Sequence, residues 1–210
     1  MAPPAFRNRR RLDPRTLAQI DVKRRILVVC EGVVTEPRYF NGLVRSQRNP
    51  RVKVVALGLG FDPKSVVEEA HSRAVGGARR SADPDDAPFD QAWAVFDRDQ
   101  HTTFDAALTL AQKLGVRVAT SAPCFELWLY LHFFDPPGGT DDCKTLGAKL
   151  SRPEALPGYD KSPDFNKLAP LVPAAMRRAR RMRDQRLRDG GPARSSPHTD
   201  VDLLVDELMK

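Results

Sequence analysis

Cysteine is scarce in this sequence of 210 residues. The three cysteines, Cys30, Cys124 and Cys143, are odd in number and form no C-x-x-C pair, so neither a disulfide framework nor a zinc knuckle is favoured. Long hydrophobic runs are also missing. No segment approaches the roughly 20 apolar residues of a membrane span, and the N-terminal stretch lacks the apolar centre of a signal peptide. These absences favour a protein of the reducing cytoplasm that does not insert into a membrane.

The residues that are present suffice for a packed core, because 41% of them are hydrophobic. Basic charge is concentrated in two segments. Residues 1–25 carry eight basic and two acidic residues, and residues 176–194 carry the same numbers. The net charge is +7, so the remainder must carry −5, because the two segments account for +12. This distribution suits a protein whose periphery meets phosphate backbones, although a solvated arginine-rich surface explains it equally well.

Apolar patterning predicts strands that alternate with helices. Strands are expected over 25–32, 52–60, 91–96 and 116–121, and helices over 34–47, 62–75, 102–115, 123–134, 165–189 and 198–210. Residues 135–163 are punctuated by proline and glycine. The alternation is typical of an α/β fold with a mainly parallel sheet flanked by helices, and the section over about 164–210 is expected to be helical. A flexible basic arm over residues 1–22 would precede this single domain over 23–210.

The stretch "AVFDRDQH" places Asp97 and Asp99 directly after a predicted strand, and Glu31 follows an earlier strand in the same way. Side chains two residues apart on an extended chain point the same way, so both aspartates can face one site. If the two strands are neighbours, Glu31 joins them. Three carboxylates held close together repel one another unless a cation or protons intervene. Oxygen ligands of this kind select hard cations such as Mg²⁺ or Mn²⁺.

These acids also have structural explanations. Asp99 suits the N-cap of the helix that starts near residue 102, and Asp97 suits an ion pair with Arg98 or Arg25. Glu31 alone is compatible with a solvated acid at a strand end. What favours a site is the combination of an acid after one buried strand and two after another.

Three further residues are candidates for roles around such a site. Glu126 is the single acid in the apolar stretch "PCFELWLYL", where its burial is costly without a partner or a metal. Glu36 and His101 are candidates for contacts with the ligands or the substrate. A polar loop residue is the other interpretation of His101.

Four stretches resemble the RloB family, whose usual forms are a CEG-x-x-TE opening, an FD-x-D, an NPCFELW block and an NP-S-T-x-V ending. They are "ILVVCEGVVTEPRYF", "FDRDQH", "SAPCFELWLYLHF" and "SPHTDVDLLVDEL". This family is similar to the Toprim-fold proteins, in which a glutamate after strand one and a D-x-D after strand three bind Mg²⁺. The resemblance therefore implies a Toprim-like fold with Glu31, Asp97 and Asp99 as metal ligands. Glu126 matches the third block and would complete the site, and it or His101 would assist proton transfer.

The resemblance implies a function as well. The family occurs in bacterial restriction and abortive-infection loci, commonly beside an ATPase gene. It implies a Mg²⁺- or Mn²⁺-dependent endonuclease of anti-phage defence with an ATPase partner, and leaves DNA, RNA and tRNA open as substrates. A homo-oligomeric assembly is also left open. The alternatives are a non-catalytic Toprim-like regulatory subunit of an ATPase-containing complex and, ranked last, a glycosyltransferase that uses D-x-D to bind a nucleotide sugar.

Basic residues near the C-terminus are the candidates for nucleic-acid binding. Lys161, in "GYDKSP", matches a frequent Y-x-K position of the family and would contact a phosphate, although a plain surface lysine is equally compatible. The run from 176 to 194 would contact the nucleic-acid backbone by charge rather than by reading bases. Its candidate residues are Arg177, Arg178, Arg180 and Arg181.

Overall fold

The structure is a computed structural model that describes residues 24–48, 50–57, 62–76, 88–98, 102–139, 141–192 and 194–210. The arm predicted over residues 1–22 lies outside these ranges. No helix among the described residues is both long enough and apolar enough to cross a membrane.

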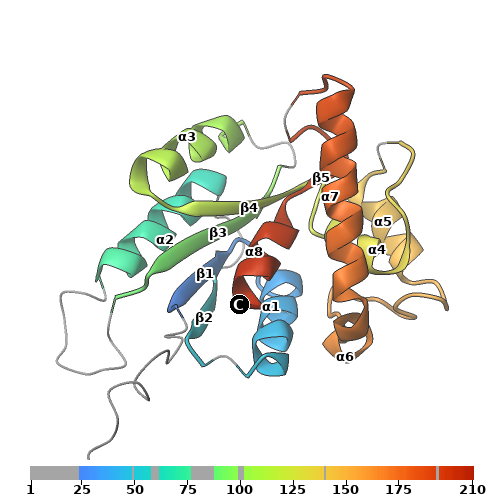
Figure 1. Cartoon of the computed structure of the whole chain (residues 1–210), viewed down its shortest axis with the longest axis horizontal. Coiled ribbons are helices and arrows are strands. Elements are labelled where there is room, and N and C mark those ends of the chain that lie inside the picture. The colour runs from blue at the N-terminus through green and yellow to red at the C-terminus, as the bar shows by residue number, and fades with distance from the viewer. Residues whose placement is uncertain are drawn as a thin grey trace, which may run out of the picture.

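A five-stranded sheet forms the centre of the molecule, in the order β2-β1-β3-β4-β5 (Figure 1). The strands are β1 (Ile26–Cys30), β2 (Val52–Ala56), β3 (Gln91–Asp97), β4 (Arg117–Ala122) and β5 (His198–Thr199). The first four run parallel, and β5 pairs antiparallel to β4. The predicted α/β class and its mainly parallel sheet are therefore confirmed, and β1 and β3 are neighbours as the site hypothesis requires.

Two hydrophobic clusters pack against opposite faces of the sheet because successive strand residues point to opposite sides. On β1, Leu27 and Val29 face the cluster that contains α2 (Pro63–Gly76) and α3 (Phe104–Leu114). Ile26, Val28 and Cys30 face a larger cluster. That second face is covered by α1 (Thr35–Ser46), α4 (Glu126–Phe133), α7 (Val172–Arg188) and α8 (Val201–Leu208). Figure 1 shows α2 and α3 together on the side of the sheet away from α1 and α8.

The C-terminal third is helical, as predicted, but its elements differ in detail. A short helix, α6 (Phe165–Leu168), and a 3-10 turn (Ala169–Leu171) precede α7, which has a proline in its first turn. The helix predicted from residue 198 begins only at Val201, because His198 and Thr199 extend the sheet as β5. An additional helix, α5 (Cys143–Leu150), lies within the segment punctuated by proline and glycine. The carboxylate of Asp142 caps it by accepting a hydrogen bond from the Thr145 N–H.

The cysteine prediction was wrong for one pair. Cys124 and Cys143 form a disulfide with their Cα atoms 5.9 Å apart, and Cys30 is a buried free thiol. The bond joins the residue two positions before α4 to the first residue of α5. Sequence spacing did not indicate this pairing, because the two cysteines meet only when α5 packs beside α4.

Candidate functional site: carboxylates at the strand ends

Acidic side chains follow the carboxyl ends of three neighbouring parallel strands. Glu31 comes directly after β1, Asp97 is the last residue of β3, and β4 leads into α4, whose first residue is Glu126. The backbone N–H of Asp97 donates a hydrogen bond to Glu31 Oε2 over 3.3 Å. The carboxyl ends of an open α/β sheet are where functional groups gather. The topology therefore brings together acids that lie up to 95 positions apart in the sequence.

Glu36 reaches the same place from the first turn of α1. Its side chain is buried, and its carboxylate folds back over Gly32, where an added Cβ would overlap the Glu36 oxygens. Glycine at this position therefore provides the space that the carboxylate occupies. We refer to Glu31, Glu36, Asp97 and Glu126 as the acidic site.

The members of the acidic site affect one another electrostatically. Burial raises the pKa of Glu36 to about 7, and the charges of Glu126 and Glu31 contribute to this rise. Burial also holds the pKa of Asp97 well above its ordinary value. The charges of Glu36, Glu126 and Glu31 raise the pKa of Asp97 further, in that order. Buried acids that raise one another's pKa in this way gain from a shared proton or a bound cation.

A segment from the other end of the domain borders the acidic site. The hydroxyl of Tyr159 donates a hydrogen bond to Glu126 Oε1 over 3.1 Å. The hydroxyl of Thr35, the first residue of α1, donates to the backbone carbonyl of Lys161 over 2.9 Å. Lys161 is exposed and has a left-handed backbone with a φ of 69°. Its positive charge lowers the pKa of Glu36 and so partly opposes the effect of burial.

Two of the predicted site residues, Asp99 and His101, lie outside the described residues. Of the predicted structural partners of Asp97, Arg98 is directed elsewhere. Its guanidinium donates to the backbone carbonyl of Arg194 over 2.7 Å and lies 5.4 Å from the centre of the Phe104 ring.

The chemistry of the acidic site suits a hard divalent cation. All of its donors are carboxylate oxygens, the ligands that Mg²⁺ and Mn²⁺ prefer, and their mutual repulsion falls when a cation binds. Among the described residues, no three histidine, cysteine, aspartate or glutamate side chains already form a ligand set for one ion. The donor set therefore fits the predicted metal by chemical type, and binding would require side-chain rearrangement.

Two of the four candidate arginines of α7, Arg178 and Arg181, contact the end of α4 opposite Glu126 or a residue just beyond it. Arg178 donates to the backbone carbonyls of Leu131 and His132, both over 2.9 Å, and pairs with Asp135. Arg181 also pairs with Asp135, over 2.7 Å. Since a helix rises 1.5 Å per residue, about 8–9 Å of α4 separates the Leu131 and His132 carbonyls from Glu126. Arg178 thus satisfies the last carbonyls of α4.

The other two arginines of this group are more accessible. Arg177 and Arg180 are exposed, and neither forms an ion pair with any residue in the described ranges. They are the members of the predicted nucleic-acid-binding set on α7 whose charges are directed to solvent.

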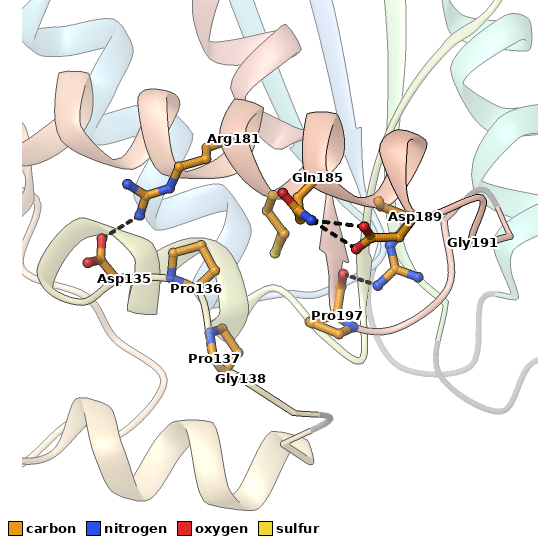
Figure 2. A pocket seen from close by; sticks show the side chains of 11 residues that line it. Asp135, Pro136, Pro137, Gly138, Arg181, Gln185, Asp189, Gly191 and Pro197 are labelled. Atoms are coloured by element: carbon orange, nitrogen blue, oxygen red, sulfur yellow. Dashed lines mark hydrogen bonds and ion pairs between the residues drawn. The ribbon is translucent and has the colours of Figure 1, made fainter.

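A pocket of about 560 Å³ lies between α7 and the stretch from Asp135 to Gly138 (Figure 2). Its polar side chains already have partners within its wall. Arg181 pairs with Asp135, Gln185 donates to Asp189 over 2.9 Å, and Arg186 donates to the Pro197 carbonyl. None of the acidic-site residues lines this pocket. The pocket therefore does not coincide with the proposed chemistry.

Together these features define an α/β protein with a carboxylate cluster at the carboxyl ends of its parallel strands. The chain belongs to the RloB-like protein family, whose model matches residues 26–208. The comparisons with curated proteins and with solved structures gave no match.

Sequence reasoning identified two residues of this region incompletely. Glu36 was expected only to contact ligands or substrate, whereas it packs among the other acids. The signal was the helical turn that follows Gly32, which returns the Glu36 side chain toward the end of β1. Tyr159 was not singled out, although it is the tyrosine of the Y-x-K match that contains Lys161. Nothing in the sequence places residue 159 beside residue 126.

Proposed function

We propose that this protein is a divalent-metal-dependent nuclease that hydrolyses phosphodiester bonds as an effector of anti-phage defence in the bacterial cytoplasm. The observation that supports the proposal most directly is the acidic site. Four carboxylates from separate parts of the chain are held where the pKa values of Glu36 and Asp97 are raised. Keeping such acids together costs stability unless they serve a ligand.

In this proposal Glu31 and Asp97, with Asp99 from outside the described residues, would hold Mg²⁺ or Mn²⁺. A cation bound there would polarise the scissile phosphate and activate water for attack. Glu126 would complete the site beside these ligands and would also accept the proton of the attacking water, a role for which His101 is the other candidate. Lys161, at the border of the site, would bind a phosphate of the substrate.

The exposed side of α7 would contact the nucleic-acid backbone. Arg177 and Arg180 face solvent, so they are available to displace counterions from phosphates. Arg178 and Arg181 already share Asp135 and would contribute less. Contacts of this kind position a nucleic acid without selecting its sequence. They leave DNA, RNA and tRNA as substrates to be compared.

The alternative is a non-catalytic regulatory subunit that docks onto an ATPase partner. The same exposed side of α7 favours it, because Arg177 and Arg180 would equally well meet an acidic surface of a partner protein. The two functions make opposite predictions for phage resistance. Substitution of Asp97 would abolish resistance if the protein is a nuclease and would leave it intact if the protein is a docking subunit. Substitution of Arg177 and Arg180 would lower resistance in both cases.

The test is cleavage by the purified full chain of DNA, RNA and tRNA, each with Mg²⁺ or Mn²⁺ and with a chelator. We expect Asp97→Asn to lower the cleavage rate at least about 100-fold, because it removes a carboxylate that would hold the cation. The matched control is Asp105→Asn, which changes an exposed acid on α3 and should retain the wild-type rate. Cleavage that persists at the wild-type rate in Asp97→Asn would contradict the assignment of the site.

A further inference from the structure

The stretch from Tyr159 to Lys161 is attached at both of its ends to the helices that carry the acidic site. The Tyr159 hydroxyl bonds to Glu126 at the start of α4, over 3.1 Å. The Lys161 carbonyl accepts a hydrogen bond from Thr35 at the start of α1, over 2.9 Å. The stretch therefore bridges the first turns of two helices that are 91 positions apart in the sequence.

The ring of Tyr159 is fixed independently of its hydroxyl. It packs against the larger hydrophobic cluster, and its backbone N–H donates to the Leu156 carbonyl over 2.9 Å. Lys161, two residues on, has a φ of 69°, a conformation that non-glycine residues adopt rarely and that the surrounding contacts must hold. A fixed ring delivers its hydroxyl to a constant position, whereas a mobile surface tyrosine would not.

We propose that Tyr159 is a positioning residue of the acidic site, whose hydroxyl orients the Glu126 carboxylate for metal binding and catalysis. The inference rests on the proposed function. A phenol hydroxyl donates one hydrogen bond, so it engages Oε1 of Glu126 and leaves Oε2 for the acidic site. Groups that hydrogen-bond to a metal-binding side chain fix its orientation, and their loss typically weakens metal affinity about 10- to 100-fold.

Electrostatics agrees with this geometry. Burial, followed by the charge of Glu126, raises the pKa of Tyr159, so the phenol remains protonated at physiological pH. It is therefore able to donate its hydrogen bond to Glu126 at physiological pH. A purely structural tyrosine would need its ring but not this hydroxyl.

The experiment measures binding of Mn²⁺ alone to the full chain, from the electron paramagnetic resonance signal of the free ion. We expect Tyr159→Phe, which keeps the ring, to weaken Mn²⁺ binding about 10-fold or more. The matched control is Tyr130→Phe. Tyr130 lies on α4 with its ring near the ammonium of Lys149, 5.7 Å away, and its substitution should leave Mn²⁺ binding unchanged.

A double-mutant cycle separates positioning from packing. Glu126→Gln should weaken Mn²⁺ binding, and adding Tyr159→Phe to it should cause little further loss, because the hydroxyl acts through Glu126. In cleavage assays, Tyr159→Phe should lower kcat about 10-fold with KM for nucleic acid unchanged. Thermal unfolding of each variant verifies that it is folded.

The outcomes distinguish the inference from the function on which it rests. Wild-type Mn²⁺ affinity in Tyr159→Phe, with lost affinity in Asp97→Asn, would overturn the inference alone. Additive losses in the double variant would also overturn it, because they would show that Tyr159 acts independently of Glu126. Absence of Mn²⁺ binding by the wild-type chain would overturn the proposed function and this inference with it.

Discussion

Two sets of buried or half-buried acids in this protein have opposite kinds of neighbour. The acids beside β5 and in α8 are matched by arginines: Asp200 pairs with Arg194 over 2.9 Å, and Asp202 forms a two-point ion pair with Arg183. The acidic site has carboxylates next to carboxylates. Glu36 and Glu126 are buried, as Asp200 and Asp202 are, so burial alone does not distinguish a structural acid from a candidate functional one.

The pKa of each set reflects this difference. Burial alone would raise the pKa of Asp200, but the adjacent His198 ring and the charge of Arg194 outweigh it and lower that pKa. Asp200 also accepts hydrogen bonds from the N–H and the hydroxyl of Thr120, which fastens the C-terminal segment to β4. The charges of neighbouring acids act on Asp97 in the opposite direction. The charges next to a buried acid thus distinguish an acid that stabilises the fold from one whose environment favours binding of a cation or proton.

We expect the largest effect from a substitution among the arginine-paired acids beside β5 and in α8. Asp200→Ala leaves Arg194 without its ion pair and the Thr120 N–H without its acceptor, so we expect the free energy of unfolding to fall by about 3–5 kcal/mol. Urea denaturation measures this loss. The control is Asp206→Ala on α8, whose ion pair with Lys210 is exposed and should contribute little to the free energy of unfolding. Equal losses in the two variants would contradict the comparison.

A second substitution tests how much the disulfide beside the acidic site stabilises the fold. The Cys124–Cys143 disulfide closes a loop between residues with a sequence separation of 19, and Cys124 lies two residues before Glu126. Cys143→Ser should lower the free energy of unfolding by about 3 kcal/mol under oxidising conditions, because the unfolded chain regains the freedom of that loop. Under reducing conditions the wild type and the variant should become similar. A variant that matches the oxidised wild type would show that the bond does not stabilise the fold.

Substitution of Glu36, in the acidic site, should have a smaller effect of opposite sign, because it should stabilise the protein and the gain should depend on pH. The pKa of Glu36 is raised from 4.5 to about 7, so the unfolded chain loses this proton at lower pH than the folded chain does. The resulting cost is absent below about pH 4.5, grows as the pH rises, and is complete above about pH 7. Glu36→Gln removes it and should stabilise the metal-free protein by roughly 2–3 kcal/mol at pH 8.

This prediction is measured by thermal or urea unfolding at pH 4.5 and pH 8 with a chelator present. At pH 4.5 the variant and the wild type should be equally stable. Glu68→Gln is the control, because Glu68 is an exposed acid of α2 that pairs with Lys64 over 3.6 Å. An unchanged or lower stability of Glu36→Gln at pH 8 would show that Glu36 is compensated within the metal-free fold.

Much of the architecture was predictable from local patterns. The continuous apolar run of β1 and the stripes of α1 and α3 specify buried strands and amphipathic helices wherever they lie in a fold. Their alternation in turn favours parallel strands. β5 was missed because a two-residue strand has no periodicity, and α5 because proline and glycine surround it. Arg178 was expected only to bind nucleic acid, since its acceptors at the end of α4 lie more than 40 positions away.

The sequence by itself determined the fold class, the strand ends that carry Glu31 and Asp97, and the family, because each depends on residues that are close together along the chain. Only the tertiary structure decided which acids meet. Glu36 and Glu126 join the acidic site because parallel strands align their carboxyl ends and the helices that follow start there. The contacts of Tyr159 with Glu126 and of Cys143 with Cys124 also form only when separate elements pack together. Packing depends on the whole core rather than on any local pattern.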